Sequence, residues 1–327
     1  MAAGAVGTTL TLANSHKVPA LGFGTWLVDA DVVGKALLEA AEVGYRHFDC
    51  AERYQNQRAI GKAFQQLWEK GYKREDFFIT SKLWCTRHDK AEESCCRTLA
   101  DLQLEYLDLY LVHFPEAFPA ETSEEVMAVN CMIFDETGGD SPYAQVTVKE
   151  TWAGMETVVD KGLARSIGIS NFAVSEIQDL LTYARIRPAV NQVELHPYNS
   201  SPALVEYCAK ESIVVTGYTS LANPYFLNEV DPDNPRRAGV KLEPLMQNEK
   251  VLSIGKSHGK TAAQVLLRWG VQRGCSVLIR SLRRERLQEN AGIFDFELTS
   301  SEMETLSSLN RDFKLVNPPW RRWPKEA

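Results

Sequence analysis

The chain has 327 residues, of which 44% are hydrophobic and 24% are charged, and its formal net charge is −7. This length allows two or three ordinary domains or one large barrel, and it can bury a core that needs no disulfide or metal. The hydrophobic fraction excludes global disorder, and the acidic balance argues against nucleic acid as the main partner, because phosphate binding needs clustered positive charge.

Neither membrane insertion nor secretion is indicated by the sequence. No apolar run approaches the roughly 20 residues that span a bilayer, and residues 1–17 lack the basic and apolar regions of a signal peptide. The seven cysteines are scattered, without a C-x-x-C pair or a spacing that suits zinc. We therefore expect a cytoplasmic protein with reduced thiols and no metal.

Short segments rich in β-branched and aromatic residues predict eight strands. In chain order they span 20–25, 45–50, 77–84, 107–113, 165–170, 189–195, 214–220 and 276–281. Before the first of them, residues 9–19 alternate around an Asn-Ser turn and predict a β-hairpin that could plug the bottom of a barrel.

Stretches with helical periodicity lie between these segments. One runs over 174–184, with apolar residues at Ile177, Leu180, Leu181 and Ala184, and another places Trp152, Met155 and Val159 on one face. Two pairs are typical of capping boxes at helix starts, namely Thr261 with Gln264 and Thr299 with Glu302.

Strands that alternate with helices indicate βαβ units and a parallel sheet, either doubly wound or closed into a barrel. The count of eight favours the barrel. No strand is followed by G-x-G-x-x-G, since GFGTWL at 22–27 lacks the third glycine. We therefore predict a single (β/α)8 TIM barrel domain over 1–327. Two long connections, 114–148 and 221–244, follow strands and are expected at the C-terminal face, where barrel active sites lie.

Four residues near consecutive strand ends could perform acid–base chemistry: Asp49, Tyr54, Lys82 and His113. A phenol is a poor acid at neutral pH, but a neighbouring cation lowers its pKa. Lys82 between Asp49 and Tyr54 would be that cation. Tyr54 could then protonate an oxygen that becomes an alkoxide, and His113 could orient the carbonyl. Each residue alone has an ordinary structural explanation. Such explanations do not account for the placement of all four at consecutive strand ends.

These residues lie within long motifs, which read VPALGFGTW, GYRHFDCAERY, ITSKLW, YLDLYLVHFP, TWAGMETVVDKGLARSIGISNF, RPAVNQVELHPY and RERLQENAGIFDFEL. Through them the sequence resembles the aldo-keto reductases over nearly its whole length. The resemblance implies a (β/α)8 barrel that reduces carbonyls with a nicotinamide cofactor bound without a Rossmann domain. It also implies that Tyr54 is the proton donor, that Lys82 and Asp49 tune it, and that His113 orients the substrate.

The resemblance further implies a cofactor site at the ends of the later strands. Its nicotinamide contacts would be Ser170, Asn171 and Gln192, with the Tyr218 ring stacked on the nicotinamide, and Thr219 and Leu221 would also bind the cofactor. Its adenosine contacts would be Arg280, Ser281, Arg286, Glu289 and Asn290. The family usually has Lys where Arg280 stands. Because Arg pairs well with phosphate, NADPH is expected, and NADH is an alternative.

Within the family, the sequence resembles the xylose reductases of the aldose reductase branch, which act on open-chain sugars and small aldehydes. That resemblance implies substrate contacts from Trp26, Trp84, Phe114 and Asn317.

Two other functions stay open. The loop after His113 resembles plant sugar-phosphate reductases, and Arg321 and Arg322 could hold an anionic sugar phosphate or keto acid. We expect instead that these two arginines form a solvated basic tail. The other function is that of a non-enzymatic redox-sensing subunit, against which the complete set of four catalytic residues argues. The chain could be a monomer or a homodimer.

Overall fold

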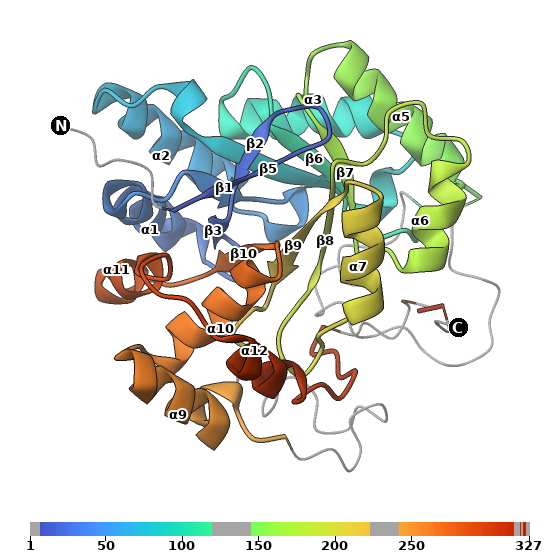
Figure 1. Cartoon of the computed structure of the whole chain (residues 1–327). Coiled ribbons are helices and arrows are strands. Elements are labelled where there is room, and N and C mark those ends of the chain that lie inside the picture. Colours follow the sequence, from blue (N-terminus) through green and yellow to red (C-terminus); the bar gives the residue numbers. More distant parts are fainter. Residues whose placement is uncertain (1–6, 120–144, 223–241, 317–320, 322, 325–327) are drawn as a thin grey trace.

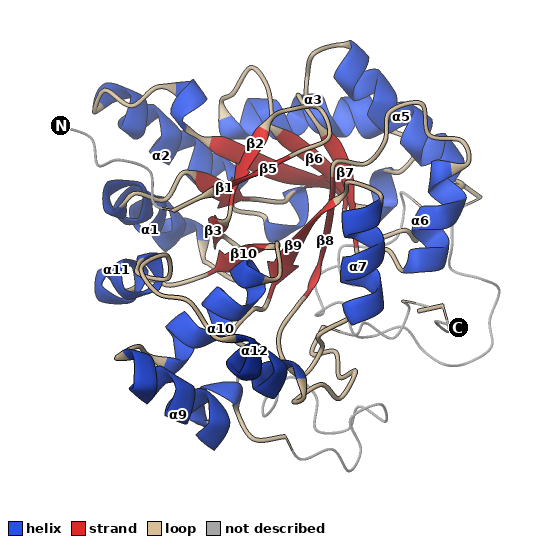
Figure 2. Cartoon of the chain, in the orientation of Figure 1, coloured by secondary structure: helices blue, strands red, loops and turns tan. Residues whose placement is uncertain are grey.

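The computed structural model describes residues 7–119, 145–222, 242–316, 321 and 323–324. Eight parallel strands close into a barrel in the order β10-β3-β4-β5-β6-β7-β8-β9. The helices surround this barrel, as the ribbon shows (Figure 1), and Figure 2 separates the inner strands from the outer helices by colour. The predicted (β/α)8 barrel is confirmed.

Each predicted strand contains an observed strand, and the observed ones are shorter. They are β3 (Leu21–Gly24), β4 (His47–Asp49), β5 (Phe78–Leu83), β6 (Leu109–Val112), β7 (Ile167–Ser170), β8 (Val190–Glu194), β9 (Val214–Tyr218) and β10 (Ser276–Ile279).

The predicted N-terminal hairpin is also present. It consists of β1 (Thr9–Thr11) and β2 (Lys17–Pro19), which pair antiparallel. Leu12 and Val18 of this hairpin join a buried apolar cluster with Phe78 and Leu109, the first residues of β5 and β6. The hairpin therefore covers the N-terminal end of the barrel and leaves the opposite end as the open mouth.

Helices follow the strands and cover the outside of the barrel. They are α1 (Ala30–Val43), α2 (Gln57–Glu69), α3 (Ala91–Leu102), α5 (Val148–Asp160), α6 (Val174–Leu181), α7 (Pro202–Lys210), α9 (Glu249–His258), α10 (Ala262–Gln272), α11 (Arg284–Ala291) and α12 (Ser300–Ser307). The two capping boxes open α10 and α12 as predicted. One detail of the periodicity was wrong, since Ala184 lies beyond the end of α6. Trp152 and Met155 are buried in the core, and Val159 is partly buried and packs against it, as predicted.

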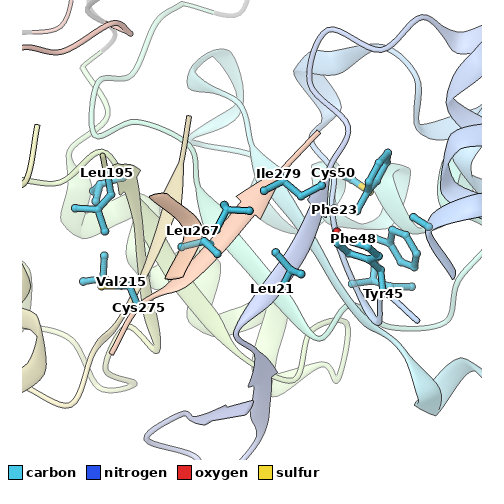
Figure 3. Packing of buried hydrophobic residues seen from close by; sticks show 14 of the residues in the cluster. Leu21, Phe23, Tyr45, Phe48, Cys50, Leu195, Val215, Leu267, Cys275 and Ile279 are labelled. Carbon is cyan, nitrogen blue, oxygen red and sulfur yellow. The ribbon is translucent and has the colours of Figure 1, made fainter. Parts of the chain in front are cut away.

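The main core lies between the strands and the helices that surround them. Figure 3 shows Phe23 and Phe48 from neighbouring strands, and Leu267 of α10 near β10. The Phe23 and Phe48 rings meet edge to face, with centres 6.1 Å apart. Since side chains alternate along a strand, Phe48 packs outward while Asp49 points inward, toward the mouth. The outward apolar residues thus fix the register that places polar residues inside.

None of the described helices combines the length and apolar character that crossing a membrane requires. Within the same ranges, no three His, Cys, Asp or Glu side chains gather closely enough to hold a metal ion.

Candidate active site

A cavity of about 390 Å³ opens at the C-terminal ends of the strands. Among the predicted site residues, those that line it are Trp26, Asp49, Tyr54, Trp84, His113, Phe114, Ser170, Asn171, Gln192, Tyr218, Thr219, Leu221, Arg280 and Arg286. The barrel brings these residues together because parallel strands end at one face.

Lys82 is the centre of a buried polar chain beneath this cavity. Its Nζ donates to Asp49 Oδ2 at 2.6 Å, to the Cys50 carbonyl at 3.0 Å and to the Tyr54 hydroxyl oxygen at 3.1 Å. The Lys82 side chain is 0% exposed and that of Asp49 is 4% exposed. An ammonium has three protons, and here each has an acceptor. The phenol oxygen accepts one of these bonds, so its own proton can be donated elsewhere.

Both ends of this chain are held by further contacts. The second Asp49 oxygen accepts from Gln192 Nε2 at 2.7 Å, across the barrel from β8. Tyr54 ends the short 3₁₀ helix η1 (Glu52–Tyr54). Glu52 fixes that helix to α3, because its carboxylate accepts from Ser94 Oγ at 2.7 Å. The phenol and the ammonium are therefore pre-positioned.

His113 follows β6 and is a neutral imidazole at pH 7. Full burial holds its pKa well below the usual range, and the charges of Lys82 and Arg53 lower it further. Its ring meets Tyr54 and Trp84 edge-on, with centres 5.9 Å and 5.1 Å away. A neutral ring in this place can donate a hydrogen bond to a carbonyl without acting as a competing acid.

The predicted nicotinamide residues form one connected set on the opposite side of the mouth. Tyr218 Oη donates to Asn171 Oδ1 at 2.7 Å, and Asn171 Nδ2 donates to the His113 carbonyl at 2.9 Å. Ser170 Oγ donates to the Gln192 carbonyl at 2.8 Å. Asn171 has a left-handed backbone, with φ of 64°, which turns the chain at the end of β7. The set presents amides and a phenol ring to the cavity.

Two arginines line the cavity near the end of β10, and they suit a cofactor that carries phosphates. Arg280 donates to the Trp26 and Leu27 carbonyls at 3.1 Å and 2.8 Å, and burial lowers its pKa. In the part of the chain that the structure describes, neither Arg280 nor Arg286 pairs with a carboxylate. Positive charge without a protein counter-ion fits a phosphorylated dinucleotide such as NADPH.

Three of the predicted adenosine residues are not part of the cavity lining. Ser281 Oγ accepts from the Arg283 amide at 3.1 Å, and the side chain of Glu289 accepts from Thr261 at the start of α10 at 2.8 Å. Asn290 is 4% exposed. These three side chains are therefore engaged with, or buried in, the protein around α11.

The predicted substrate residues occupy the side of the cavity near β5 and β6. Trp84 and Phe114 meet edge to face with centres 6.3 Å apart, and both are buried except for the surface that they give to the cavity. Trp26 joins them after β3. Asn317, the fourth predicted residue, lies outside the described residues.

The C-terminal tail is anchored at the mouth by two buried ionic contacts that the sequence did not reveal. Glu194 at the end of β8 accepts from the amides of Leu315 and Val316 at 2.6 Å and 2.7 Å, and from His196 Nε2 at 2.7 Å. Val316 itself lines the cavity.

Arg321 makes the second contact, and its expected place in a solvated tail is wrong. The residue is 1% exposed, and it donates to Glu116 and Glu176 at 2.7 Å and 2.6 Å and to the Asn171 carbonyl at 2.9 Å. Two carboxylates compensate the buried charge. Arg322 lies outside the described residues.

Arg53 is a pocket residue that the sequence reasoning missed. It belongs to η1 and lines the cavity, with its guanidinium carbon 5.4 Å from the centre of the Trp84 ring. The available signal was its position directly before Tyr54 in the motif GYRHFDCAERY.

Comparison with known proteins gives consistent matches. The model of the Aldo/keto reductase family matches residues 20–311. "Aldo-keto reductase family 1 member A1-A" of Danio rerio is 39% identical over 95% of this chain and 92% of its own length. The "NADPH-dependent D-xylose reductase" of Meyerozyma guilliermondii is 39% identical over 97% and 99%. The solved aldose reductase of Schistosoma japonicum has a TM-score of 0.80 at 37% identity and covers 93% of each chain.

Proposed function

Because this chain belongs to the aldo/keto reductase family, we propose that its cavity reduces aldehydes and open-chain aldoses such as xylose to alcohols, with NADPH as cofactor and NADH as an alternative. The names of the yeast relative and of the similar solved structure support this choice of substrate and cofactor. The observation that carries the proposal is the Lys82 ammonium, which bonds to the Asp49 carboxylate and to the Tyr54 phenol beside the cavity.

The protein's own residues supply the proton and hold the carbonyl. Tyr54 donates a proton to the carbonyl oxygen as negative charge develops there. The Lys82 ammonium, 3.1 Å from the phenol oxygen, stabilises the resulting phenolate, and Asp49 holds the ammonium in place. Neutral His113 donates a hydrogen bond to the same carbonyl oxygen and fixes its direction. A bound nicotinamide supplies the hydride to the carbonyl carbon.

The cofactor site proposed here uses the second half of the barrel. Ser170, Asn171 and Gln192 would bind the nicotinamide carboxamide, and the Tyr218 ring would stack on the nicotinamide. Arg280 and Arg286 would bind phosphate. The cytoplasmic location, the single domain over 1–327 and a monomeric or homodimeric state stay predictions.

Replacement of the proton donor tests the proposal. Tyr54→Phe removes the hydroxyl and should lower kcat for xylose and 4-nitrobenzaldehyde by about 10²- to 10⁴-fold, the usual contribution of a general acid. Activity is followed by loss of NADPH absorbance, and cofactor binding by quenching of tryptophan fluorescence, which should change little.

Tyr207→Phe is the matched control, because Tyr207 lies on α7 outside the cavity lining. Turnover by Tyr54→Phe within tenfold of the unmodified protein would refute the assignment of the donor. A wild-type protein that reduced no carbonyl would instead favour the redox-sensing subunit.

A further inference from the structure

Arg53 lies in the half of the cavity that faces the substrate. It precedes Tyr54 in η1, and its guanidinium lies over the Trp84 ring. The centre of that ring is 5.1 Å from the centre of the His113 ring. The Arg53 cation and the imidazole that would orient the carbonyl therefore both neighbour the Trp84 ring, and the Arg53 charge contributes to the lowered pKa of His113. Arg280 and Arg286, in contrast, lie near the end of β10.

The carboxylates of Asp49, Glu52 and Glu116 each form an ion pair with a cation other than Arg53. Glu52, the neighbour of Arg53 in the chain, is bonded to Arg97. Asp49 is bonded to Lys82, and Glu116, which follows β6, is bonded to Arg321. Within the described ranges, Arg53 pairs with no carboxylate.

The Arg53 guanidinium also has an unused donor. Its Nε is buried and has no hydrogen-bond partner among the described residues. A buried donor is normally satisfied, and an unsatisfied one in a native protein needs an explanation. The Trp84 ring supports the guanidinium, and the Arg53 side chain lines the cavity.

We propose that Arg53 binds an anionic group of the substrate, a carboxylate or a phosphate, and that the enzyme prefers aldehydes and aldoses that carry such a group. This inference rests on the carbonyl reduction proposed above and names its substrate class. A guanidinium forms paired hydrogen bonds with either anion. Arg321 does not have this role, because its guanidinium is bonded to Glu116 and Glu176. The preferred molecules are short, since Arg53 and His113 both neighbour the Trp84 ring.

Paired substrates that differ in charge test this inference. The ratio of kcat/KM for 4-carboxybenzaldehyde over 4-nitrobenzaldehyde is measured with NADPH, together with the corresponding ratios for D-glucuronate and for D-glucose 6-phosphate over D-glucose. Arg53→Gln should lower at least one of these ratios by about 10- to 100-fold, the effect of a charge-assisted hydrogen bond. A fall in the ratio for D-glucuronate would identify the anion as a carboxylate, and a fall in the ratio for D-glucose 6-phosphate would identify it as a phosphate.

Two further variants show whether the effect comes from the positive charge of Arg53, from the planar shape of its guanidinium, or from the loss of any arginine. Arg53→Lys keeps the charge without the planar fork and should restore part of the ratio. Arg58→Gln removes an exposed arginine that pairs with Asp101 outside the cavity, and it should leave the ratios unchanged. A ratio within twofold of the wild type for all pairs in Arg53→Gln would overturn the inference, as would a rise in the KM for NADPH as its only effect.

A binding measurement tests the anion site independently of the proposed carbonyl reduction. The affinity of benzoate for the protein with bound NADP⁺ is measured by calorimetry, which needs no turnover. Arg53→Gln should weaken benzoate about tenfold or more and leave benzamide unaffected. If no aldehyde is reduced but benzoate binding depends on Arg53, only the proposed reaction fails. If aldehydes are reduced but benzoate binding ignores Arg53, only the anion site fails.

Discussion

The ion pair of Lys82 and Asp49 can be tested for stability and activity at once. The two groups are 2.6 Å apart, and their side chains are 0% and 4% exposed. Replacement of Lys82 by Met keeps the length of the side chain but leaves the Asp49 carboxylate buried with only Gln192 as a side-chain donor. Loss of one partner of a buried pair typically costs about 3–5 kcal/mol of the free energy of unfolding.

A double variant shows whether that cost comes from the unpaired charge. Asp49→Asn combined with Lys82→Met removes both charges, and replacing a buried pair by neutral groups is often close to neutral. The Gln192 amide can still donate to the amide oxygen introduced at position 49. We therefore expect the double variant to be more stable than Lys82→Met alone by about 2 kcal/mol.

The assay is urea unfolding of the wild type, both single variants and the double variant, followed by far-ultraviolet circular dichroism at pH 7. In each variant kcat for 4-nitrobenzaldehyde should fall about 10²-fold or more, because no ammonium supported by a carboxylate stabilises the phenolate. We therefore expect the double variant to regain stability relative to Lys82→Met but to stay as inactive as the single variants. A Lys82→Met variant within about 1 kcal/mol of the wild type, or a double variant less stable than it, would contradict the buried-charge argument.

Two other positions give independent predictions. Arg280→Ala should raise the KM for NADPH about tenfold, and it should raise the KM for NADH by a smaller factor, because only NADPH has the additional phosphate. Equal increases in the two KM values in steady-state kinetics would refute the phosphate contact. Glu194→Gln replaces the anion that holds the Leu315 and Val316 amides. Trypsin cleavage after Lys314 should then be about tenfold faster at 25 °C, because hydrogen bonds to a charged group contribute about 1.5–3 kcal/mol. An unchanged cleavage rate would contradict the role of Glu194 in holding the tail.

The barrel and the residues at its strand ends were predictable because the necessary information is local. Short segments rich in β-branched and aromatic residues identified each strand, and alternating strands and helices imply parallel neighbours in chain order. The register of β4 and β5 pairs Asp49 with Thr80, which places Lys82 one inward-facing position further along. The adjacency of Asp49 and Lys82 follows from that register alone.

The tail contacts were not predictable because their partners are distant in the sequence. Arg321 is 205 residues from Glu116 and 145 residues from Glu176. Judged by its neighbours, the segment RRWPKEA is polar and charged, which is typical of a solvated end. Burial of Arg321 depends on where the loop after β6 and the first turn of α6 place their carboxylates, and no local pattern predicts that placement.

Whether a cation at the barrel mouth has a carboxylate partner separates structural from ligand-binding roles in this barrel. Lys82 and Arg321 each have a carboxylate partner in the described structure, so their charges are compensated when the protein folds. Arg53, Arg280 and Arg286 line the cavity without such a partner in those same ranges. A cation that lines a cavity without a protein carboxylate can take its anion from a ligand. Two of the three lie near the proposed cofactor phosphates, whereas Arg53 precedes Tyr54 and lies over the Trp84 ring, beside the proposed substrate contacts.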